Sequence, residues 1–454
     1  MKCGCSAAWR RTAGKDRTME YYGEESRRAR DNFPLQHRLT DLKLIYAIVE
    51  VKKAAALTYA QLGTDPELYR AVAEACDRVL AGEADDQFVT QALQGGAGTS
   101  AHMNVNEVLA AMAGECLGRK VRPVDDVNRG QSTNDVYPTA LRIASIRCIR
   151  ELSEECARLQ ESLQRREAEF VSVSKLGRTE MMDAVPVTLG EEFGAMAQAI
   201  ARDRWRLYKI EERLRQVNLG GTAVGLYDTA DRQYRFRVIE QLRRQTGIGL
   251  AAAEYPMDVT QNNDVFVEVS GLLKALAVNL MKLSQDLRLM NSGPYGGLGE
   301  IHLQMLQKGS SIMPGKVNPV IPEMTMQCAM RVIANDSAIT MAASRGEFEL
   351  NAFLPLIADA LLESLHLMTR ACAIMREKCI DTLKADPERC RQLLEGSLAG
   401  ATSYVPFLGY DTVTDVIRQG KEPEEIMKEL ERMKQERMKC HHQLSQKPLS
   451  CDSL

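Results

Sequence analysis

The pattern of apolar and polar positions predicts helices along most of the chain. From Val269 to Met290, apolar side chains recur every third or fourth residue, which places them in one stripe along a helix of about six turns. The stripe consists of Val269, Leu272, Leu276, Leu280, Leu283, Leu287 and Met290. We expect a stripe of this length to be covered by another subunit, because obligate subunit interfaces bury apolar surface that one chain leaves open.

Five more stretches have the same helical spacing, and the loops between them are short and rich in small polar residues. The stretches are 135–164, 188–216, 231–246, 322–343 and 352–379. Alternating strand patterns are weak, and only residues 170–179 resemble one arm of a short hairpin. Helices this long are typical of a bundle, so we predict an all-α fold with a long central helical bundle.

Composition and charge narrow the class of protein. A chain of 454 residues is long enough for two or three domains, each with its own core. Its 58 basic and 61 acidic residues leave a formal charge of −3, which argues against a general attraction to nucleic acid or to anionic membranes. No apolar run reaches about 20 residues, and Met1–Arg11 lacks the apolar core of a secretory signal, so we expect a cytoplasmic protein.

The twelve cysteines are scattered along the chain, and none belongs to a paired CxxC and histidine spacing. We interpret them as free thiols in a reducing compartment. Cys3 with Cys5, and Cys440 with His441 and His442, have the chemistry to bind a metal ion, but both groups lie in terminal segments that look disordered. We therefore predict no metal site.

Three loops combine glycine with hydroxyl and amide side chains directly before a predicted helix. They are residues 95–107, 128–140 and 308–319, the last of which reads KGSSIMPGKVNP. Backbone N–H groups at a helix N-terminus favour anions, so each loop is a candidate anion site. Plain helix capping is the alternative for any one loop taken alone. The capping candidates in the second loop are Ser132, Thr133 and Asn134.

Five segments resemble the aspartase/fumarase superfamily, and most specifically its aspartase branch. In chain order they are GGAGTSAHMNVNEV (95–108), QSTNDVYPTA (131–140), GRTEMMDAVPVTLGEEF (177–193), the stretch from QNND to SGP (261–294) and GSSIMPGKVNPVIPE (309–323). The resemblance runs from about Tyr21 to about Gly420, and its last segment is the most specific. The preceding MKCGCSAAWRRTAGKDRT looks unrelated to the family, so Met19 is an alternative start.

This resemblance implies a mostly helical protomer of three domains that assembles into a homotetramer. The long central helices of four subunits would form a core of twenty helices, and each active site would be shared by three subunits. The expected divisions are an unrelated segment 1–20, an N-terminal helical domain 21–133, a central bundle 134–382 with a mobile lid 293–318, a small C-terminal helical domain 383–432 and a charged tail 433–454.

The resemblance also implies an aspartate ammonia-lyase, which removes ammonia from L-aspartate to give fumarate and needs no organic cofactor. Removing a proton beside a carboxylate leaves a dianionic enediolate, so hydrogen-bond donors around that carboxylate matter most. The match assigns the base to Ser310, the β-carboxylate to Thr99, Ser132, Thr133 and Ser311, the α-carboxylate to Lys316 and Asn318 with Met313 lining the pocket, and the amine to Asn134 and Thr179.

Three positions depart from the family pattern. Glu180 stands where fumarases have histidine, and beside Glu323 it would give a pair of carboxylates that suits an ammonium group better than water. The same residue leaves room for a cationic or substituted amino acid as substrate. His102 replaces the usual asparagine and is either structural or a positive charge near an anion site. Tyr295 replaces the arginine that usually follows SGP.

Four functions remain to be distinguished. The leading one is elimination of ammonia from aspartate, and Glu180 favours the second, a related lyase that releases another amine. The third is a fumarase. The fourth is a non-catalytic helical scaffold, because members of this superfamily also serve as structural proteins of the lens. In each enzymatic case the partners are a small dicarboxylate or amino acid and other copies of the chain, with neither nucleic acid nor membrane.

Overall fold

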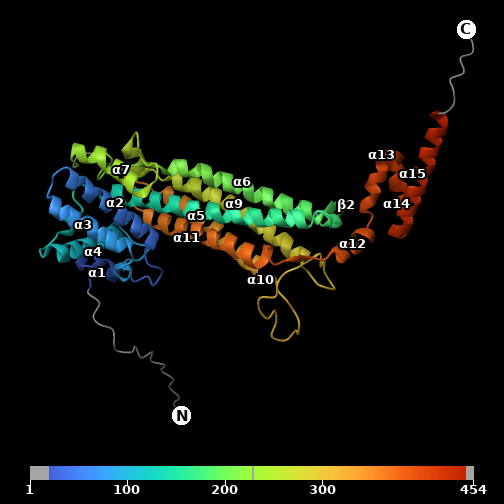
Figure 1. Cartoon of the computed structure of the whole chain (residues 1–454), viewed down its shortest axis with the longest axis horizontal. Helices are drawn as coiled ribbons and strands as arrows, with labels where there is room; N and C mark the ends of the chain where they lie inside the picture. The colour runs from blue at the N-terminus through green and yellow to red at the C-terminus, as the bar shows by residue number, and fades with distance from the viewer. Residues whose placement is uncertain (1–19, 227–229, 446–454) are drawn as a thin grey trace, which may run out of the picture. The chain divides into compact units, whose positions relative to one another are not determined.

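Long helices dominate the chain, as the apolar spacing predicts (Figure 1). The computed structural model describes residues 20–226 and 230–445. Its long helices are α5 (Thr133–Glu169), α6 (Leu189–Leu214), α7 (Arg232–Thr246), α9 (Asp264–Met290), α10 (Val320–Ala343) and α11 (Leu354–Met375). The predicted all-α class is therefore confirmed, whereas nearly all of the predicted segment 1–20 lies outside the described residues.

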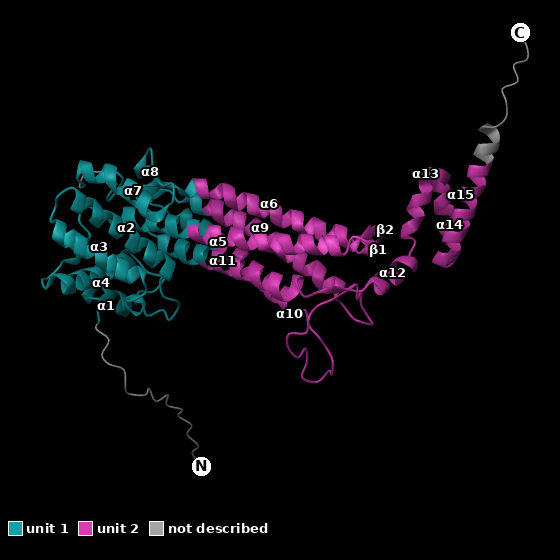
Figure 2. Cartoon of the chain, in the orientation of Figure 1, with its two compact units in different colours: residues 1–146, 213–266, 338–362 teal, residues 147–212, 267–337, 363–454 magenta. Residues whose placement is uncertain are grey.

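The chain divides into two compact units (Figure 2). Unit 1 takes in residues up to 146 together with 213–266 and 338–362, and unit 2 takes in 147–212, 267–337 and the chain from 363 onward. Helices α5, α6, α9, α10 and α11 each contribute residues to both units. The division into three domains stays a prediction.

Unit 1 is built around a helix that is apolar on most of its circumference. That helix is α2 (Leu42–Gln61), and it packs against α3 (Pro66–Leu80) and α7, while α3 packs against α4 (Thr99–Leu117). Asp41, Asp65 and Asp231 cap α2, α3 and α7 by accepting backbone N–H groups. The smaller elements of this unit are α1 (Glu24–Asn32), η1 (Asp85–Gln87), η2 (Pro123–Val127), α8 (Pro256–Gln261) and the parallel pair β3 (Gln216–Val217) and β4 (Ala251–Ala252).

Five long helices form a closed ring within unit 2, where Figure 2 shows them running side by side. Polar or thiol side chains join each helix to the next. The joining pairs are Arg150–Glu211 between α5 and α6, Asp203–Asn279 between α6 and α9, Ser270–Asp336 between α9 and α10, Asn335–Ser364 between α10 and α11, and Cys156–Cys372 between α5 and α11. The predicted long helical bundle is therefore present within a single chain.

The apolar stripe of α9 lies inside this ring. Val269, Leu276, Leu280, Leu283, Leu287 and Met290 are all buried, and only Leu272 is partly exposed. The expectation that another subunit must cover this stripe is therefore wrong, because the neighbouring helices of the same chain already bury it.

A hairpin and a group of short helices complete unit 2. Strands β1 (Ser174–Thr179) and β2 (Met182–Thr188) form the antiparallel hairpin that residues 170–179 suggest, and β5 (Ile301–His302) pairs with β6 (Lys384–Ala385). The remaining elements are η3 (Arg376–Ile380), α12 (Pro387–Glu395), η4 (Ala399–Tyr404), α13 (Val405–Leu408), α14 (Tyr410–Ile417) and α15 (Pro423–Ser445). Ala401, Leu408, Val413, Val416, Ile426 and Leu430 form a separate apolar core among the last of these.

Helix α15 continues well into the predicted tail 433–454, because it ends only at Ser445. Ion pairs four residues apart, Glu424 with Lys428 and Arg432 with Glu436, support its exposed surface. Within residues 20–226 and 230–445, no helix is both long and apolar enough to cross a bilayer. Eight of the cysteines in these ranges form no disulfide, and most of them are buried.

Candidate active site

The first two polar loops meet in unit 1. Thr99 and Thr133 begin α4 and α5, and the Thr99 hydroxyl lies 3.3 Å from the Thr133 hydroxyl and 2.7 Å from the Gly96 carbonyl. Gly98 makes this approach possible. Its φ is +97°, and a Cβ atom there would lie 2.4 Å from the ring of Tyr137 on α5. The structure thus brings together two hydroxyls that the resemblance assigns to one carboxylate.

The second loop is held in place by a buried carboxylate. Asp135 accepts backbone N–H groups from Ser132, Gly220 and Thr222 at 2.9, 3.0 and 3.1 Å. Burial raises the pKa of Asp135 to about 6, although these three donors act in the opposite direction. The residue was not among the candidates, since an aspartate in the first turn of a helix is ordinary in sequence terms.

Side chains of the second loop make capping and loop-stabilising contacts. The Ser132 hydroxyl accepts the backbone N–H of Asn134 at 3.2 Å, as a helix cap does. The Asn134 side-chain amide donates to the Ala223 carbonyl at 2.8 Å. Both side chains therefore stabilise the loop, and an amide with two N–H donors retains one for a ligand.

His102 is buried behind the two threonine hydroxyls. It is 1% exposed, and its Nδ1 lies 2.8 Å from the Thr133 hydroxyl oxygen. Burial, helped by the nearby charge of Lys52, holds the pKa of His102 well below its ordinary value. A neutral ring fits the structural alternative for this residue better than the charged one.

Lys52 is a second buried residue with an ionisable side chain, and it was not among the residues predicted from the sequence. It is 1% exposed in α2, and its ammonium donates to the Asn128 side-chain oxygen at 2.6 Å. Burial lowers the pKa of Lys52 to about 7, and Asp135 and Cys76 act weakly against that shift. In the sequence, the only indication that Lys52 is buried is its position in the largely apolar run around VKKAAA.

Replacing Lys52 with methionine is expected to change how stability depends on pH. The pKa of Lys52 is lower in the folded state than in the unfolded state, so between about pH 7 and 10 the unfolded chain binds more protons. Stability therefore rises with pH across this window, at up to about 1.4 kcal/mol per unit. Urea midpoints at one protein concentration should rise with pH more steeply for the wild type than for Lys52→Met. Parallel curves would contradict this account.

The third loop belongs to unit 2 and contains the predicted base. The Ser310 hydroxyl oxygen accepts backbone N–H groups from Ile312 and Met313 at 3.1 and 3.0 Å. Two donors that converge on one oxygen stabilise negative charge on it. A serine that removes a proton must carry such charge, so the local backbone supports the role that the resemblance assigns to Ser310.

Contacts between its two ends hold the third loop closed. The Asn318 side-chain amide donates to the Gly309 carbonyl at 2.8 Å, and a Cβ atom on Gly309 would lie 2.1 Å from the Lys316 carbonyl oxygen. Only glycine permits this close approach. Asn318 therefore shapes the loop in addition to its predicted contact with a carboxylate, while Ser311, Met313 and Lys316 are exposed on the loop itself.

The hairpin holds the remaining predicted contacts at its tip. Thr179 ends β1, and the two turn residues that follow, Glu180 and Met181, have φ of +52° and +66°. Left-handed backbone costs a residue with a side chain about 1–2 kcal/mol. Positive φ at both residues is what the two-residue turn between the paired Thr179 and Met182 requires, so the hairpin itself explains this conformation. Both turn residues are exposed.

The carboxylate of Glu323 lies near an arginine side chain. It is 3.9 Å from the Arg288 guanidinium, and across the described parts of the chain no hydrogen bond or ion pair joins it to Glu180. The pairing of this carboxylate with Glu180 stays a prediction. Tyr295, the other departure from the family pattern, is 97% exposed.

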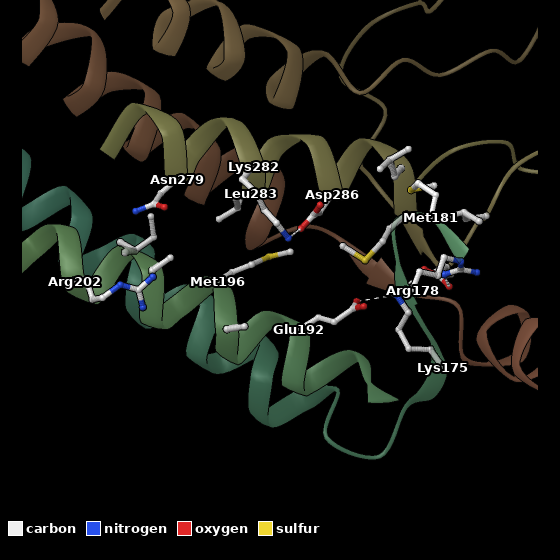
Figure 3. A pocket seen from close by; sticks show the side chains of 17 residues that line it. Lys175, Arg178, Met181, Glu192, Met196, Arg202, Asn279, Lys282, Leu283 and Asp286 are labelled. Atoms are coloured by element: carbon white, nitrogen blue, oxygen red, sulfur yellow. Dashed lines mark hydrogen bonds and ion pairs between the residues drawn. The ribbon is translucent and has the colours of Figure 1, made fainter. Parts of the chain in front are cut away.

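A buried ion cluster links the hairpin to Glu300, the residue directly before β5. Glu300 is fully buried and pairs with Lys175 at 2.7 Å and with Arg178 at 2.8 Å, and Lys175 also pairs with Glu192 at 2.7 Å. These residues are among those that line a cavity of about 470 Å³ (Figure 3). Arg178 directly precedes Thr179, so the cluster fixes the strand that presents the hairpin tip.

The predicted site residues fall into two groups. Unit 1 contains Thr99, His102, Ser132, Thr133 and Asn134, and unit 2 contains Thr179, Glu180, Ser310, Ser311, Met313, Lys316, Asn318 and Glu323. Within residues 20–226 and 230–445, no group of three or more histidine, cysteine, aspartate or glutamate side chains is placed to hold a metal ion. The terminal groups Cys3 with Cys5 and Cys440 with its histidines lie outside the described side chains.

Comparison with known proteins decides the family. A family model described as Lyase matches residues 13–334. The aspartate ammonia-lyase of a Bacillus species is 41% identical over 417 residues, which cover 90% of this chain and 89% of that protein. The chain belongs to the aspartase/fumarase superfamily of lyases. The predicted resemblance and the prediction of a lyase are confirmed.

Other members of the superfamily give the same result. The aspartate ammonia-lyase of Pseudomonas aeruginosa is 43% identical over 415 residues, or 88% of this chain and 87% of that protein. A solved structure described as fumarate lyase:delta crystallin from Brucella melitensis, bound to cobalt, has a TM-score of 0.87 and 42% identity over 92% of this chain and 94% of its own. The class II fumarase of Schistosoma mansoni has a TM-score of 0.87 and 31% identity over 91% and 92% of the two chains.

Proposed function

We propose that this chain is a carbon–nitrogen lyase that eliminates ammonia from L-aspartate to give fumarate. The observation that carries the proposal is the extent of its similarity to relatives named aspartate ammonia-lyase, which are 39–43% identical over 86–90% of the chain. The structure adds a serine whose hydroxyl oxygen is stabilised by two N–H donors. It also adds two adjoining threonine hydroxyls suited to a carboxylate.

Each step then has a residue to perform it. The Ser310 oxygen takes the proton from Cβ, and the electron pair moves into the neighbouring carboxylate to form the enediolate. Hydroxyl and backbone N–H donors of Thr99, Thr133 and Ser311 stabilise that charge. The electron pair returns to form the double bond as the C–N bond breaks, so ammonia leaves and fumarate remains. Lys316 holds the second carboxylate through the elimination.

The same proposal includes a homotetramer with active sites shared between subunits, and a cytoplasmic location. Large apolar side chains stay exposed on the long helices of unit 2, as expected of surfaces that meet another copy of the chain. They include Trp205 and Tyr208 on α6, Val278 on α9 and Met330 on α10. A shared site would also explain why the predicted residues come from loops of both units.

A substrate panel tests the proposed reaction directly. The purified protein should increase fumarate absorbance with L-aspartate, and it should not do so with malate or argininosuccinate. Absence of aspartate turnover would overturn the proposed substrate. Turnover of a cationic or substituted amino acid in its place would favour the second candidate function, which the exposed carboxylate of Glu180 supports.

Replacing Glu180 with glutamine separates these two substrates. If aspartate is the substrate, the variant loses a charge-assisted hydrogen bond to the ammonium group, so KM for aspartate should rise about tenfold. Better turnover of aspartate by Glu180→Gln would indicate that the native substrate carries additional positive charge. Glu424→Gln, an exposed carboxylate on α15, is the matched control and should leave KM unchanged.

A further inference from the structure

A proline inside α5 leaves one backbone group of the second loop without its helical partner. Pro138 has no N–H, so the carbonyl of Asn134, four residues earlier, cannot accept the usual helical hydrogen bond. A buried asparagine from another segment supplies the missing donor. The Asn218 side-chain amide donates to the Asn134 carbonyl at 2.9 Å, and Asn218 is only 1% exposed. The proposed function gives no role to Asn218.

The partners of the Asn218 amide fix its orientation. A backbone carbonyl only accepts, so the amide nitrogen of Asn218 must face Asn134, and a turned amide would set oxygen against oxygen. The same nitrogen donates to the Thr260 hydroxyl oxygen at 2.8 Å, and Thr260 gives its own hydrogen to the Pro256 carbonyl at 2.8 Å. Helix α8 contains both Thr260 and Pro256, so Asn218 is anchored to that helix.

The side chain of Asn134 is held by the segment that follows Asn218. Its amide nitrogen donates to the Ala223 carbonyl at 2.8 Å, and this carbonyl again determines which end of the amide faces it. The segment is tied to α5 because Gly220 and Thr222 donate their backbone N–H groups to Asp135. Among the described residues, the side-chain oxygen of Asn134 accepts no hydrogen bond, so it is available to a ligand.

We propose that Asn218 is a positioning residue that holds Asn134 so that its side-chain oxygen accepts a hydrogen from the amino group of the ligand. An ammonium group only donates, so it needs such an acceptor. Asn218 fixes the backbone of Asn134, and the Ala223 carbonyl fixes its side chain. Asn218 thereby favours a ligand that carries an amino group, although it does not touch that ligand itself. The inference rests on the proposed function for the identity of the ligand.

Two ligands that differ in the amino group test this role. In Asn218→Leu, which loses both donors, KM for L-aspartate should rise about tenfold, whereas Ki for succinate, which has two carboxylates and no amino group, should stay within about twofold. A residue that only supports the fold would change both constants alike. Equal rises in KM and Ki, or an unchanged KM, would overturn the proposal. If Asn218→Leu does not fold, Asn218→Ala removes the same donors and carries the same expectation.

Asn351→Leu is the matched control for this substitution. Asn351 is also buried in unit 1, and its amide donates to the backbone carbonyls of Ala342 and Ala343 at 3.0 and 3.1 Å. The control therefore loses two comparable hydrogen bonds, but at the end of α10 and not at the second loop. It should lower the urea midpoint and leave both KM and Ki unchanged. A rise in KM relative to Ki as large as that of Asn218→Leu would contradict the proposal.

Hydrogen exchange tests the same inference without any assay of activity. In the ligand-free protein, backbone amides of residues 131–137 should exchange at least about fivefold faster in Asn218→Leu than in the wild type, because the loop has lost a fixed contact. In Asn351→Leu they should exchange at the wild-type rate. Unchanged exchange in Asn218→Leu would overturn the proposal. If the wild type does not act on aspartate, this result still decides the inference separately from the proposed function.

Discussion

Replacing Ser310 with alanine is expected to lower kcat for ammonia elimination about a thousandfold or more. General-base catalysis contributes about 10²–10⁴ to rate, and the variant also lacks the oxygen on which the Ile312 and Met313 N–H groups converge. The Cβ proton of aspartate is only weakly acidic, so another acceptor does not replace the lost base. Fumarate absorbance under saturating aspartate measures the effect.

The two N–H contacts also give Ser310 a structural role in its turn, so alanine alone leaves two explanations for lost activity. Ser310→Asn separates them. An asparagine side chain accepts the same backbone N–H groups in a turn but has no hydroxyl to act as base. Both variants should be inactive and should keep the oligomeric state of the wild type. Activity above about a tenth of wild type in either variant would refute the assignment of Ser310 as base.

The helices were predictable because their apolar spacing is long and regular. The stretch 231–246 and the observed α7 differ by one residue at the start, since Asp231 is the N-cap. The hairpin was indicated only in part, because its turn uses Glu180 and Met181 in left-handed conformations that neither residue favours. The interpretation of the α9 stripe failed because spacing identifies an apolar face without identifying what covers it.

Sequence motifs predicted the candidate site residues that lie within those motifs. Resemblance located Thr99, Thr133 and Ser310, and the structure shows why the first two adjoin and how the third is stabilised. Lys52 and Asp135 were not predicted. Charged residues are normally exposed, so a sequence pattern counts them as surface positions, and only the tertiary structure shows that these two are buried behind the loops.

Glu300, which sequence patterns also miss, gives the second large expected effect. Replacing it with glutamine leaves the buried Lys175 and the partly buried Arg178 without the carboxylate that both contact. Removing one partner of a buried ion pair lowers the free energy of unfolding by about 3–5 kcal/mol. The urea unfolding midpoint should therefore fall strongly. Activity should fall as well, because Arg178 fixes the strand that ends at Thr179.

The fall in the urea midpoint depends on how deeply the carboxylate is buried, and Glu192 provides a matched control. Glu192 pairs with the same Lys175 at the same distance of 2.7 Å, but it is 31% exposed whereas Glu300 is 0% exposed. Glu192→Gln should therefore lower the urea midpoint by less than a third of the fall in Glu300→Gln. In the double variant Glu300→Gln with Lys175→Met, part of the loss should be recovered, since one uncompensated charge is gone. Equal losses for the two single variants would show that the buried pairing does not hold the hairpin.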